Sequence, residues 1–531
     1  MKAMSRFFFF ITLMTLAFTG CGKKDEHSSK VVKAPSQALK LNIKSEPHTL
    51  DPRKIRALAD ANLVRMFNEG LTRINKNGEA SLALAKNVEI SEDGLTYRFS
   101  LHPTKWSNGD ALTSHDFAYA WKKSLTPTFN SPNAHMLFVI KNAKEVKMGK
   151  LPTSLLGIEA PDEHTLVIQL DHPVPYLLEL TEHPIFFPVN EKLDRVNPNW
   201  AENQDSYISS GPFQMKEWKH HNLIEATYNP RYWDAKAVKL SSLTMYMVTE
   251  ETGFNMFGAN ELDWDGSPFS TIPIDAIDHL KQSDTLESAP VLATQWIRIN
   301  LSKKPFESQK LRKALALAIN RQDIVDHITQ GNQIPATGIV PITMGLQEKP
   351  YFQDGNTELA AELFEEGLLE LGMTREQLPE IVFTYPAGER THPVTQALQQ
   401  QWNAALGIQV RLEPVESKVY FSRVSKQDYT LALGSWFADF NDPVNFLEVF
   451  KTKSNGTNNP SYTELIDTSY LSLDKEERLS YLRQSEQLIM DDMPVIPIFY
   501  YTLLFVKDEA LKDVVLTKTG SIDFKWAQIN K

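Results

Sequence analysis

The sequence predicts an α/β protein with a partly parallel sheet, because strand-like runs alternate with helices in its second half. Apolar residues at helical spacing predict helices at Glu358–Gly372 and Pro393–Leu406. Strand-like runs stand before and after the second helix, at Pro379–Tyr385 and Ile408–Leu412. This βαβ succession is typical of parallel strands with helices packed on their faces.

Length and composition allow several domains. The chain has 531 residues, 42 % of them hydrophobic, and domains average about 150 residues. The net charge of −11, and a sequence without a basic patch interleaved with aromatic residues, argue against nucleic acid as a partner. No internal repeat is visible.

The first twenty residues have the pattern of a bacterial secretory signal. Lys2 and Arg6 precede an apolar run, Phe7–Phe18, and small residues follow it. A membrane-spanning helix needs about 20 apolar residues, so this shorter run predicts a signal peptide over residues 1–20.

Cys21 is the only cysteine, and it follows the Thr19-Gly20 pair. This arrangement resembles a bacterial lipobox, although Phe18 stands where that pattern usually has Leu. The resemblance implies a diacylated Cys21 that anchors the mature chain to a membrane on the periplasmic side of the cell envelope. The alternative is a plain secreted protein with a free thiol. Residues 21–37 are polar and are expected to form a tether.

Local patterns predict the elements that follow in the first part of the chain. A strand is expected at Ala38–Ile43, and a helix at Asp60–Leu71 with Asp60 as its N-cap. Val88–Leu101 has the alternation of a hairpin. Thr113–Lys123 starts with a Ser/Thr cap and an acidic first turn, which predicts another helix.

Two further segments are assigned to the fold and not to a site. Trp106–Asp110 is expected to be a turn in which Gly109 takes positive φ. Leu311–Asn320 predicts an amphipathic helix. Its inward residues would be Leu311, Leu315, Ala318 and Ile319, and its solvated ones Arg312, Lys313 and Arg321.

The segment Leu433–Pro443, LGSWFADFNDP, surrounds one acid, Asp439, with aromatic residues. A partly desolvated carboxylate needs a cationic partner, so Asp439 could hold one ammonium group. The alternative is that Asp439 only caps the turn that follows, as Asp often does beside Asn and Pro.

Taken together, these segments resemble a known family. EPHTLDP, SEDGLTYRFSLHPTKWSNGD, LTSHDFAYAW, LRKALALAINR, WNAALGIQV, LGSWFADFNDP, SNGTNNPSY and PVIPIFYY occur in the order found in the oligopeptide- and dipeptide-binding lipoproteins of ABC importers. The likeness covers essentially the whole mature chain.

The resemblance implies a class II periplasmic-binding fold, with two hinged lobes and an extra inserted α+β domain. Lobe I would comprise residues 38–68, 190–291 and 500–531, the inserted domain II residues 69–189, and lobe III residues 292–499. Two apolar runs are fit for the buried strands that cross between the lobes, Leu292–Ile297 and Val495–Tyr500.

The family holds an extended peptide as an added strand between the lobes, so its motifs imply binding residues here. The α-ammonium of the ligand would go to Asp439. Main-chain partners are expected in Arg56, Ala57 and Leu58 and in Gly434–Phe437, which includes Ser435. Trp436 would wall a side-chain pocket or belong to the core.

The carboxylate end of the ligand is where this sequence departs from the family. Relatives that take tri- and tetrapeptides have an Arg three residues before the matching Trp, and Leu433 stands there. A shift of one position would place Arg423 and His392 at two other basic positions of the family. Ser417 replaces an aromatic residue of some relatives and would open a pocket.

The function implied is that of a monomeric lipoprotein that captures oligopeptides and delivers them to the permease and ATPase subunits of an ABC importer. The alternatives are a receptor of the same family for cell-wall (murein) peptide, nickel chelate or haem, a secreted hydrolase, and an adhesin. The sequence has no Gly-x-Ser-x-Gly, no His-Glu-x-x-His and no P-loop, so no enzyme is expected. It also has no His/Cys/Asp cluster at ligand spacing, so neither metal nor cofactor is expected.

Overall fold

The computed structural model describes residues 37–451, 459–472 and 474–530, all of which belong to one compact unit, Ala34–Lys531. The predicted signal peptide, Cys21, nearly all of the tether and part of the SNGTNNPSY motif lie outside the described residues. Gln37, predicted as the end of the tether, is the first residue of strand β1.

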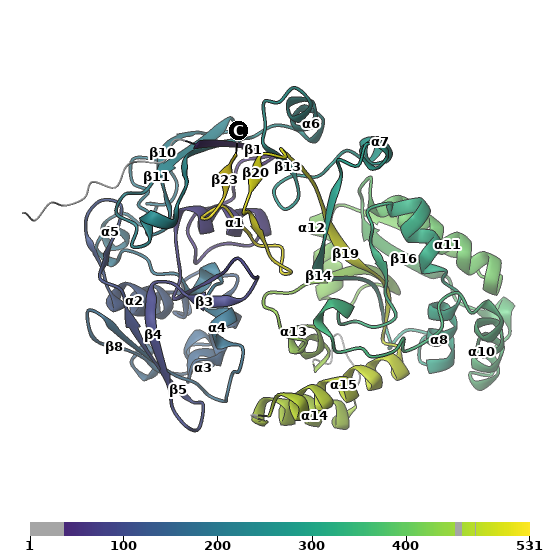
Figure 1. The fold of residues 1–531 in the computed structure, drawn as a ribbon. Helices are drawn as coiled ribbons and strands as arrows, with labels where there is room; N and C mark the ends of the chain where they lie inside the picture. Colours follow the sequence, from purple (N-terminus) through teal and green to yellow (C-terminus); the bar gives the residue numbers. More distant parts are fainter. Residues whose placement is uncertain (1–36, 452–458, 473, 531) are drawn as a thin grey trace, which may run out of the picture. The chain divides into compact units, whose positions relative to one another are not determined.

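One large mixed sheet runs through the described chain (Figure 1). Its strand order is β10-β11-β12-β1-β13-β19-β14-β18-β16-β17, and β15 pairs with β19 in addition. The bounds in that order are Phe213–Lys219, Leu223–Tyr228, Leu240–Tyr246, Gln37–Asn42, Trp264–Gly266, Val495–Lys507, Glu287–Ile299, Leu431–Phe437, Ile381–Pro386 and Val410–Val415, with β15 at Ile334–Pro335.

The two central strands, β14 and β19, are thirteen residues each and pair with one another in antiparallel fashion. They contain the runs predicted as buried crossing strands, and the structure confirms that both runs are buried strands. β13 pairs with the C-terminal end of β19, whereas β18 pairs with the C-terminal part of β14. The two halves of the sheet are therefore joined through these two strands.

The predicted βαβ rhythm is confirmed. Strand β16 lies parallel to both β17 and β18, and helices α10 (Thr357–Glu370) and α11 (Thr391–Leu406) follow the predicted ranges within two residues. In Figure 1, α8, α10 and α11 lie on the right, beside β16. Buried Phe383 and Trp402 pack between this sheet and its helices.

The helix predicted at Leu311–Asn320 is α8 (Gln309–Leu317), but the prediction that its arginines are solvated is wrong. Arg312 and Arg321 are both buried. The guanidinium of Arg312 donates to the carboxylate and the carbonyl of Asp492, and that of Arg321 donates to Asp354 and to the carbonyl of Pro497. Arg312 ties α8 to a distant segment, and Arg321 does the same for the start of the next helix, α9 (Arg321–Asp323).

A separate four-stranded antiparallel sheet has the order β4-β5-β9-β8 and lies within residues 69–189. The hairpin predicted at Val88–Leu101 is β4 and β5, and the helix predicted at Thr113–Lys123 is α2, with the capping box of Thr113 and Asp116 in place. The bounds are β4 Ala85–Ile90, β5 Thr96–Leu101, β8 Ile158–Asp162, β9 Thr165–Gln169 and α2 Ser114–Ser124.

Helix α1 begins earlier than predicted, at Leu58, and ends at Phe67. Its N-cap residue is Ala57, so the prediction that Asp60 caps the helix is wrong. The carboxylate of Asp60 instead lies 3.2 Å from Nδ1 of His48 and accepts the backbone N–H of that residue. Gly109 does take positive φ (99°), as predicted for its turn.

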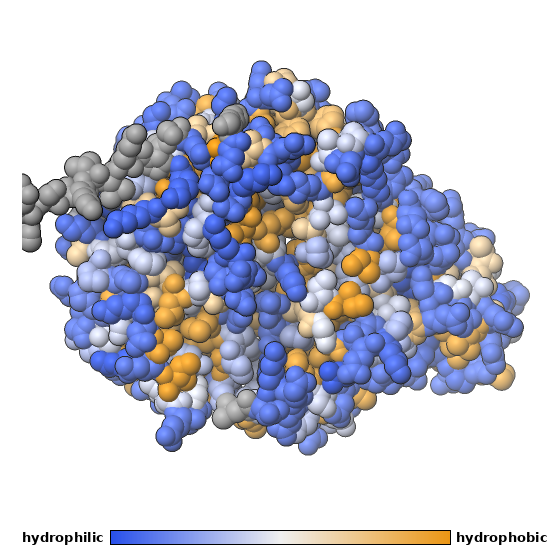
Figure 2. All heavy atoms as spheres, in the orientation of Figure 1, coloured by the Kyte–Doolittle hydropathy of each residue, from blue (hydrophilic) through white to orange (hydrophobic). Residues whose placement is uncertain are grey.

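Hydrophilic side chains cover most of the face seen in Figure 2, and apolar side chains gather near its middle and at its lower left. Among the described residues, no helix is long and apolar enough to cross a membrane.

Candidate functional site

Strand β18 has one paired edge and one largely open edge. All seven of its residues, Leu431–Phe437, pair with β14. On the other side, β16 pairs only with Leu431 and Ala432, and no other described strand continues the pairing. The main chain of residues 433–437 therefore offers an edge to which an extended segment can be added.

Asp439 lies two residues beyond the end of this strand and is half-buried. None of the described backbone N–H groups donates to its carboxylate. The turn is capped by Asp442 instead, which accepts the N–H of Val444 at 2.9 Å and pairs with Arg478 through two 2.8 Å bonds. The turn-cap alternative for Asp439 is therefore wrong.

The carboxylate of Asp439 faces a histidine from a distant part of the sequence. Nε2 of His135, in the short helix η1 (Ala134–Val139), lies 3.8 Å from Oδ2 of Asp439. This proximity raises the pKa of His135 despite its partial burial. His183 lies in the same region, but burial lowers its pKa to about 3, so it stays neutral.

Asn445 fixes the segment around Asp439. Its side-chain oxygen accepts the indole N–H of Trp436 at 2.8 Å and the backbone N–H of Asp439 at 3.2 Å. Trp436 is half-buried and packs against a large cluster of buried hydrophobic residues that includes Trp296 and Phe450. It lines neither of the two cavities described below. This placement favours the core role that the sequence left open for Trp436.

Gly434 is crowded by side chains of the neighbouring strand. A Cβ at this position would lie 2.8 Å from Nε1 of Trp296 and 3.0 Å from Nε of Arg298. Its carbonyl accepts a hydrogen bond from the side-chain amide of Gln295 at 2.5 Å. The close approach expected at Gly434 exists, but in this structure it is made by the chain's own side chains.

Ser435 and Phe437 point toward β19. Tyr501 hydrogen-bonds the Ser435 side chain, and its ring lies 5.0 Å from that of Phe437. The Phe437 side chain is nonetheless 45 % exposed.

The predicted Arg56–Leu58 segment leads into α1, and a buried ion network fixes the chain just before it. The guanidinium of Arg53 is paired with the carboxylates of Asp51 and Asp194. Although burial opposes it, Arg53 holds the pKa of Asp194 well below its usual range. The side chain of Leu58 packs beside Gly520, which also adjoins Val291 of β14.

Arg423 and His392, predicted for the ligand carboxylate, both have partners within the fold, and Ser417, predicted to open a pocket, lies outside the two cavities described below. Arg423 is paired with Glu413 at 2.7 Å and with Asp428 at 3.3 Å. His392 is bonded through Nδ1 to the hydroxyl of Tyr385. Ser417 is the exposed first residue of α12 (Ser417–Ser425), and in the described structure none of the three lines either cavity.

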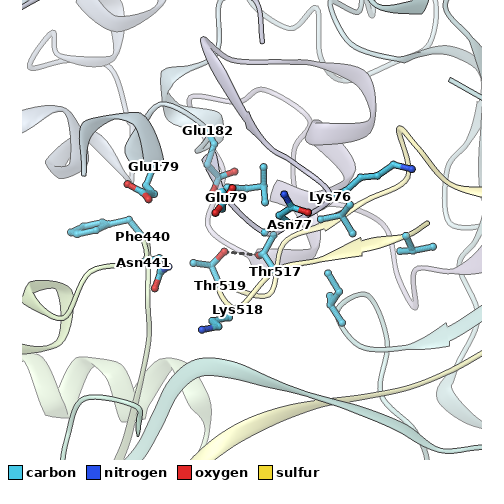
Figure 3. Close-up of a pocket in the computed structure, with 15 residues that line it drawn as sticks. Lys76, Asn77, Glu79, Glu179, Glu182, Phe440, Asn441, Thr517, Lys518 and Thr519 are labelled. Carbon is cyan, nitrogen blue, oxygen red and sulfur yellow. Dashed lines mark hydrogen bonds between the residues drawn. The ribbon is translucent and has the colours of Figure 1, made fainter. Parts of the chain in front are cut away.

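A polar cavity of about 500 Å³ lies next to Asp439 (Figure 3). Phe440 and Asn441, the residues that follow Asp439, form one side of it. Glu179 lies beside Phe440, Glu182 lies farther along the cavity, and Lys518 belongs to a third segment. Because its lining carries both charges, the cavity can hold water and varied polar groups.

A second cavity of about 350 Å³ lies beside the strand itself. Leu433 and Phe437 of β18 line it together with Tyr501, and Arg390 is the one basic side chain among its described lining residues. The two cavities thus adjoin opposite ends of the segment from Leu433 to Asn441.

Sequence reasoning missed the residues that other segments bring to Asp439 and β18. His135, His183 and the residues 267–274 are far from the LGSWFADFNDP motif in sequence. No local pattern marks them, because a lone histidine or a short apolar loop is common anywhere. The described residues contain no group of three or more His, Cys, Asp or Glu that could hold a metal ion.

The sequence profile of the bacterial extracellular solute-binding proteins, family 5 Middle, matches residues 79–458. The chain belongs to this family. It is 38 % identical to the oligopeptide-binding protein OppA of Bacillus subtilis (strain 168), over 97 % of this chain and 98 % of that protein. The family membership expected from the sequence motifs is confirmed.

Solved structures of the family share the fold. The Haemophilus influenzae OppA complex with the peptide RPPGFSPFR has a TM-score of 0.79 and 26 % identity, covering 94 % of this chain and 100 % of that one. The Escherichia coli murein tripeptide binding protein MppA has a TM-score of 0.80 and 26 % identity, with the same coverage. The expected two-lobe class II periplasmic-binding fold is confirmed.

Proposed function

We propose that this protein is the substrate-binding component of an ABC importer and captures oligopeptides for delivery to its permease. The observation that carries the proposal is the open edge of β18, which leads to a carboxylate, Asp439, that caps nothing in the fold. An extended peptide can add to such an edge through main-chain bonds, which give affinity without reading side chains.

The ligand's α-ammonium would bind Asp439. His135, 3.8 Å away, is the only described cation paired with this carboxylate, and a ligand ammonium would take its place or share the site. Arg56–Leu58 would supply main-chain partners from the opposite side, since Leu58 packs near β14 beside Gly520. The polar cavity gives hydrated room for side chains near the amino end.

A murein-peptide receptor is the second candidate, and Leu433 favours it. This side chain is buried and replaces the basic residue of the tripeptide-binding relatives, so an ordinary free carboxylate has no partner at that position. MppA, which is similar to this chain, is described as a murein tripeptide binding protein.

Calorimetric titration with Ala-Ala-Ala and with its N-acetylated form tests the proposal. Free tripeptide should bind, and acetylation should weaken binding at least about tenfold because it removes the charge that Asp439 needs. Equal binding of both peptides would contradict the assignment of Asp439. Binding of neither, together with binding of a diaminopimelate-containing tripeptide, would favour the murein candidate.

We further propose that Cys21 is diacylated and anchors a monomeric receptor to a membrane at the periplasmic side of the envelope. The support is the sequence pattern alone. Labelled fatty acid should be incorporated into the wild type and not into Cys21→Ser, and the variant should leave the membrane fraction. Labelling of the variant would contradict the proposal.

A further inference from the structure

The cavity of about 350 Å³ beside β18 has apolar walls from both halves of the central sheet. Strands β14, β18 and β19 form its floor, and the loop 267–274 and the start of α11 form its sides. In Figure 2, apolar side chains gather in the middle of the face, over the region of β14 and β19 in Figure 1. The large apolar lining residues that carry the argument are Ile274, Val291, Leu433, Phe437, Phe499 and Leu503.

Two of these side chains are largely exposed, one on the floor of the cavity and one on its side. Phe437 is 45 % exposed and Ile274 is 44 % exposed, whereas Val291, Leu433 and Phe499 are buried. Exposed apolar side chains that line a concave surface are typical of a binding site, whereas single exposed apolar side chains elsewhere are common on any protein. Covering both side chains would add favourable apolar burial.

The cavity adjoins the open edge of β18, to which the peptide is proposed to bind. Phe437 is the last residue of β18 and stands two residues before Asp439, and Leu433 lies on the same face of the strand because side chains alternate. A peptide paired to this edge would direct every second side chain to the face where Leu433 and Phe437 line the cavity.

The charged groups of the cavity are at its mouth. Glu389 and Arg390 are exposed residues just before α11, and Arg390 already donates to the carbonyl of Ile272 at 2.7 Å. Its guanidinium also lies 3.9 Å from Glu250. A ligand carboxylate or ammonium inside the cavity would therefore lose water without gaining a dedicated partner.

Resting on the proposed function, we propose that this cavity is a subsite for one bulky apolar side chain of the bound peptide. The receptor then selects peptides with Phe, Leu, Ile or Tyr at the one position that faces this cavity, while the polar cavity next to Asp439 accepts other side chains. Its volume lies near the lower end of the range of about 300–1,000 Å³ for small-molecule sites, which suits one side chain.

Competition calorimetry with three tripeptide series tests the subsite. Phe, Ala, Lys or Asp is placed in turn at position 1, 2 or 3 of an alanine tripeptide. The peptide with Phe should bind about tenfold or more tightly than the one with Ala, and those with Asp and Lys more weakly, at one of the three positions only. Equal affinities throughout, or an apolar preference at more than one position, would overturn the subsite and leave the proposed function standing.

A matched pair of variants locates the preference. Ile274→Ala should reduce the preference for Phe over Ala to less than about threefold. Ile342→Ala, an isoleucine with 47 % exposure outside the cavity, should keep the full preference. An unchanged preference in Ile274→Ala would overturn the assignment. If no peptide of any series binds the wild type, the proposed function fails together with the subsite.

Discussion

At the level of single residues, peptide capture depends on Asp439, whose carboxylate does not cap the turn that follows it. Asp442 holds the turn, so the charge of Asp439 is available to a ligand. The backbone of Asp439 is held separately, through its N–H, by Asn445.

Asp439→Asn should weaken the binding of a free tripeptide about 30-fold or more, because an amide cannot pair with the ligand ammonium. Calorimetry measures this loss. The control is the N-acetylated tripeptide, whose affinity should be the same for wild type and variant. A loss of similar size for both peptides would instead indicate that the substitution damages the fold.

Peptide binding should also depend on pH through His135. The pKa of His135 is raised by Asp439, with a smaller contribution from Glu448, while the nearby His183 stays neutral. The ion pair is fully present below the ordinary histidine pKa of about 6.5 and is lost as pH rises through the raised value. A peptide therefore competes with a charged His135 at low pH, and this competition weakens as pH rises through the raised pKa.

We expect tripeptide affinity to rise between pH 5.5 and pH 7 in the wild type, below the ligand's own α-amino pKa of about 7.7–8.0, and His135→Asn to flatten the profile across this range. Titrations at both pH values in the two proteins measure the difference. The same slope in both proteins would assign the pH dependence to another group.

At the scale of elements, helix α15 (Lys475–Asp492) supports the segment that carries Asp439. Arg478 of this helix makes the paired hydrogen bonds to Asp442, and both side chains are buried. Breaking a buried pair leaves one uncompensated charge, which typically costs about 3–5 kcal/mol.

Arg478→Met should therefore lower the free energy of unfolding by about 3–5 kcal/mol. Denaturant unfolding measures it, and Glu476→Gln, at an exposed position of the same helix, should change stability by less than about 0.5 kcal/mol. The double variant Asp442→Asn/Arg478→Met should recover part of the loss. No recovery would contradict the pairing as its cause.

Elements with a strong local pattern could be predicted from the sequence, and partners from distant segments could not. The spacing of apolar residues placed α11, and the Thr113 and Asp116 pattern placed the start of α2. Arg312 was predicted as solvated because periodicity counts any arginine as polar, whereas its acceptor Asp492 lies in another helix.

In the candidate site too, the residue with a local sequence pattern was predicted and the residues from distant segments were not. Asp439 was found from one local motif and from family resemblance. His135, and the loop that faces Phe437, were not found, because tertiary packing alone brings them there. The open edge of β18 is likewise a property of the sheet order.

At the scale of the whole molecule, contacts join the segments predicted as domain II and lobe III. The ring of Tyr176 stacks on that of Phe440 at 4.6 Å, and His172 lies 4.8 Å from Tyr470. The predicted lobes I and III also meet where Lys518 donates to the carbonyl of Thr343. A receptor that opens to admit a peptide must break these contacts.

Saturating tripeptide should therefore reduce the radius of gyration in solution scattering, because a ligand that bridges the lobes favours the closed state. Asp439→Asn should need far more peptide for the same change. An identical radius with and without peptide would rule out ligand-driven closure.

The most direct test of peptide capture is native mass spectrometry of the purified protein, with the bound ligand released and sequenced. We expect a mixture of peptides of two to five residues with free amino ends. A single dominant mass that contains diaminopimelate or a D-residue would make the protein a cell-wall peptide receptor. A protein that carries no ligand and ignores added tripeptides would contradict the account.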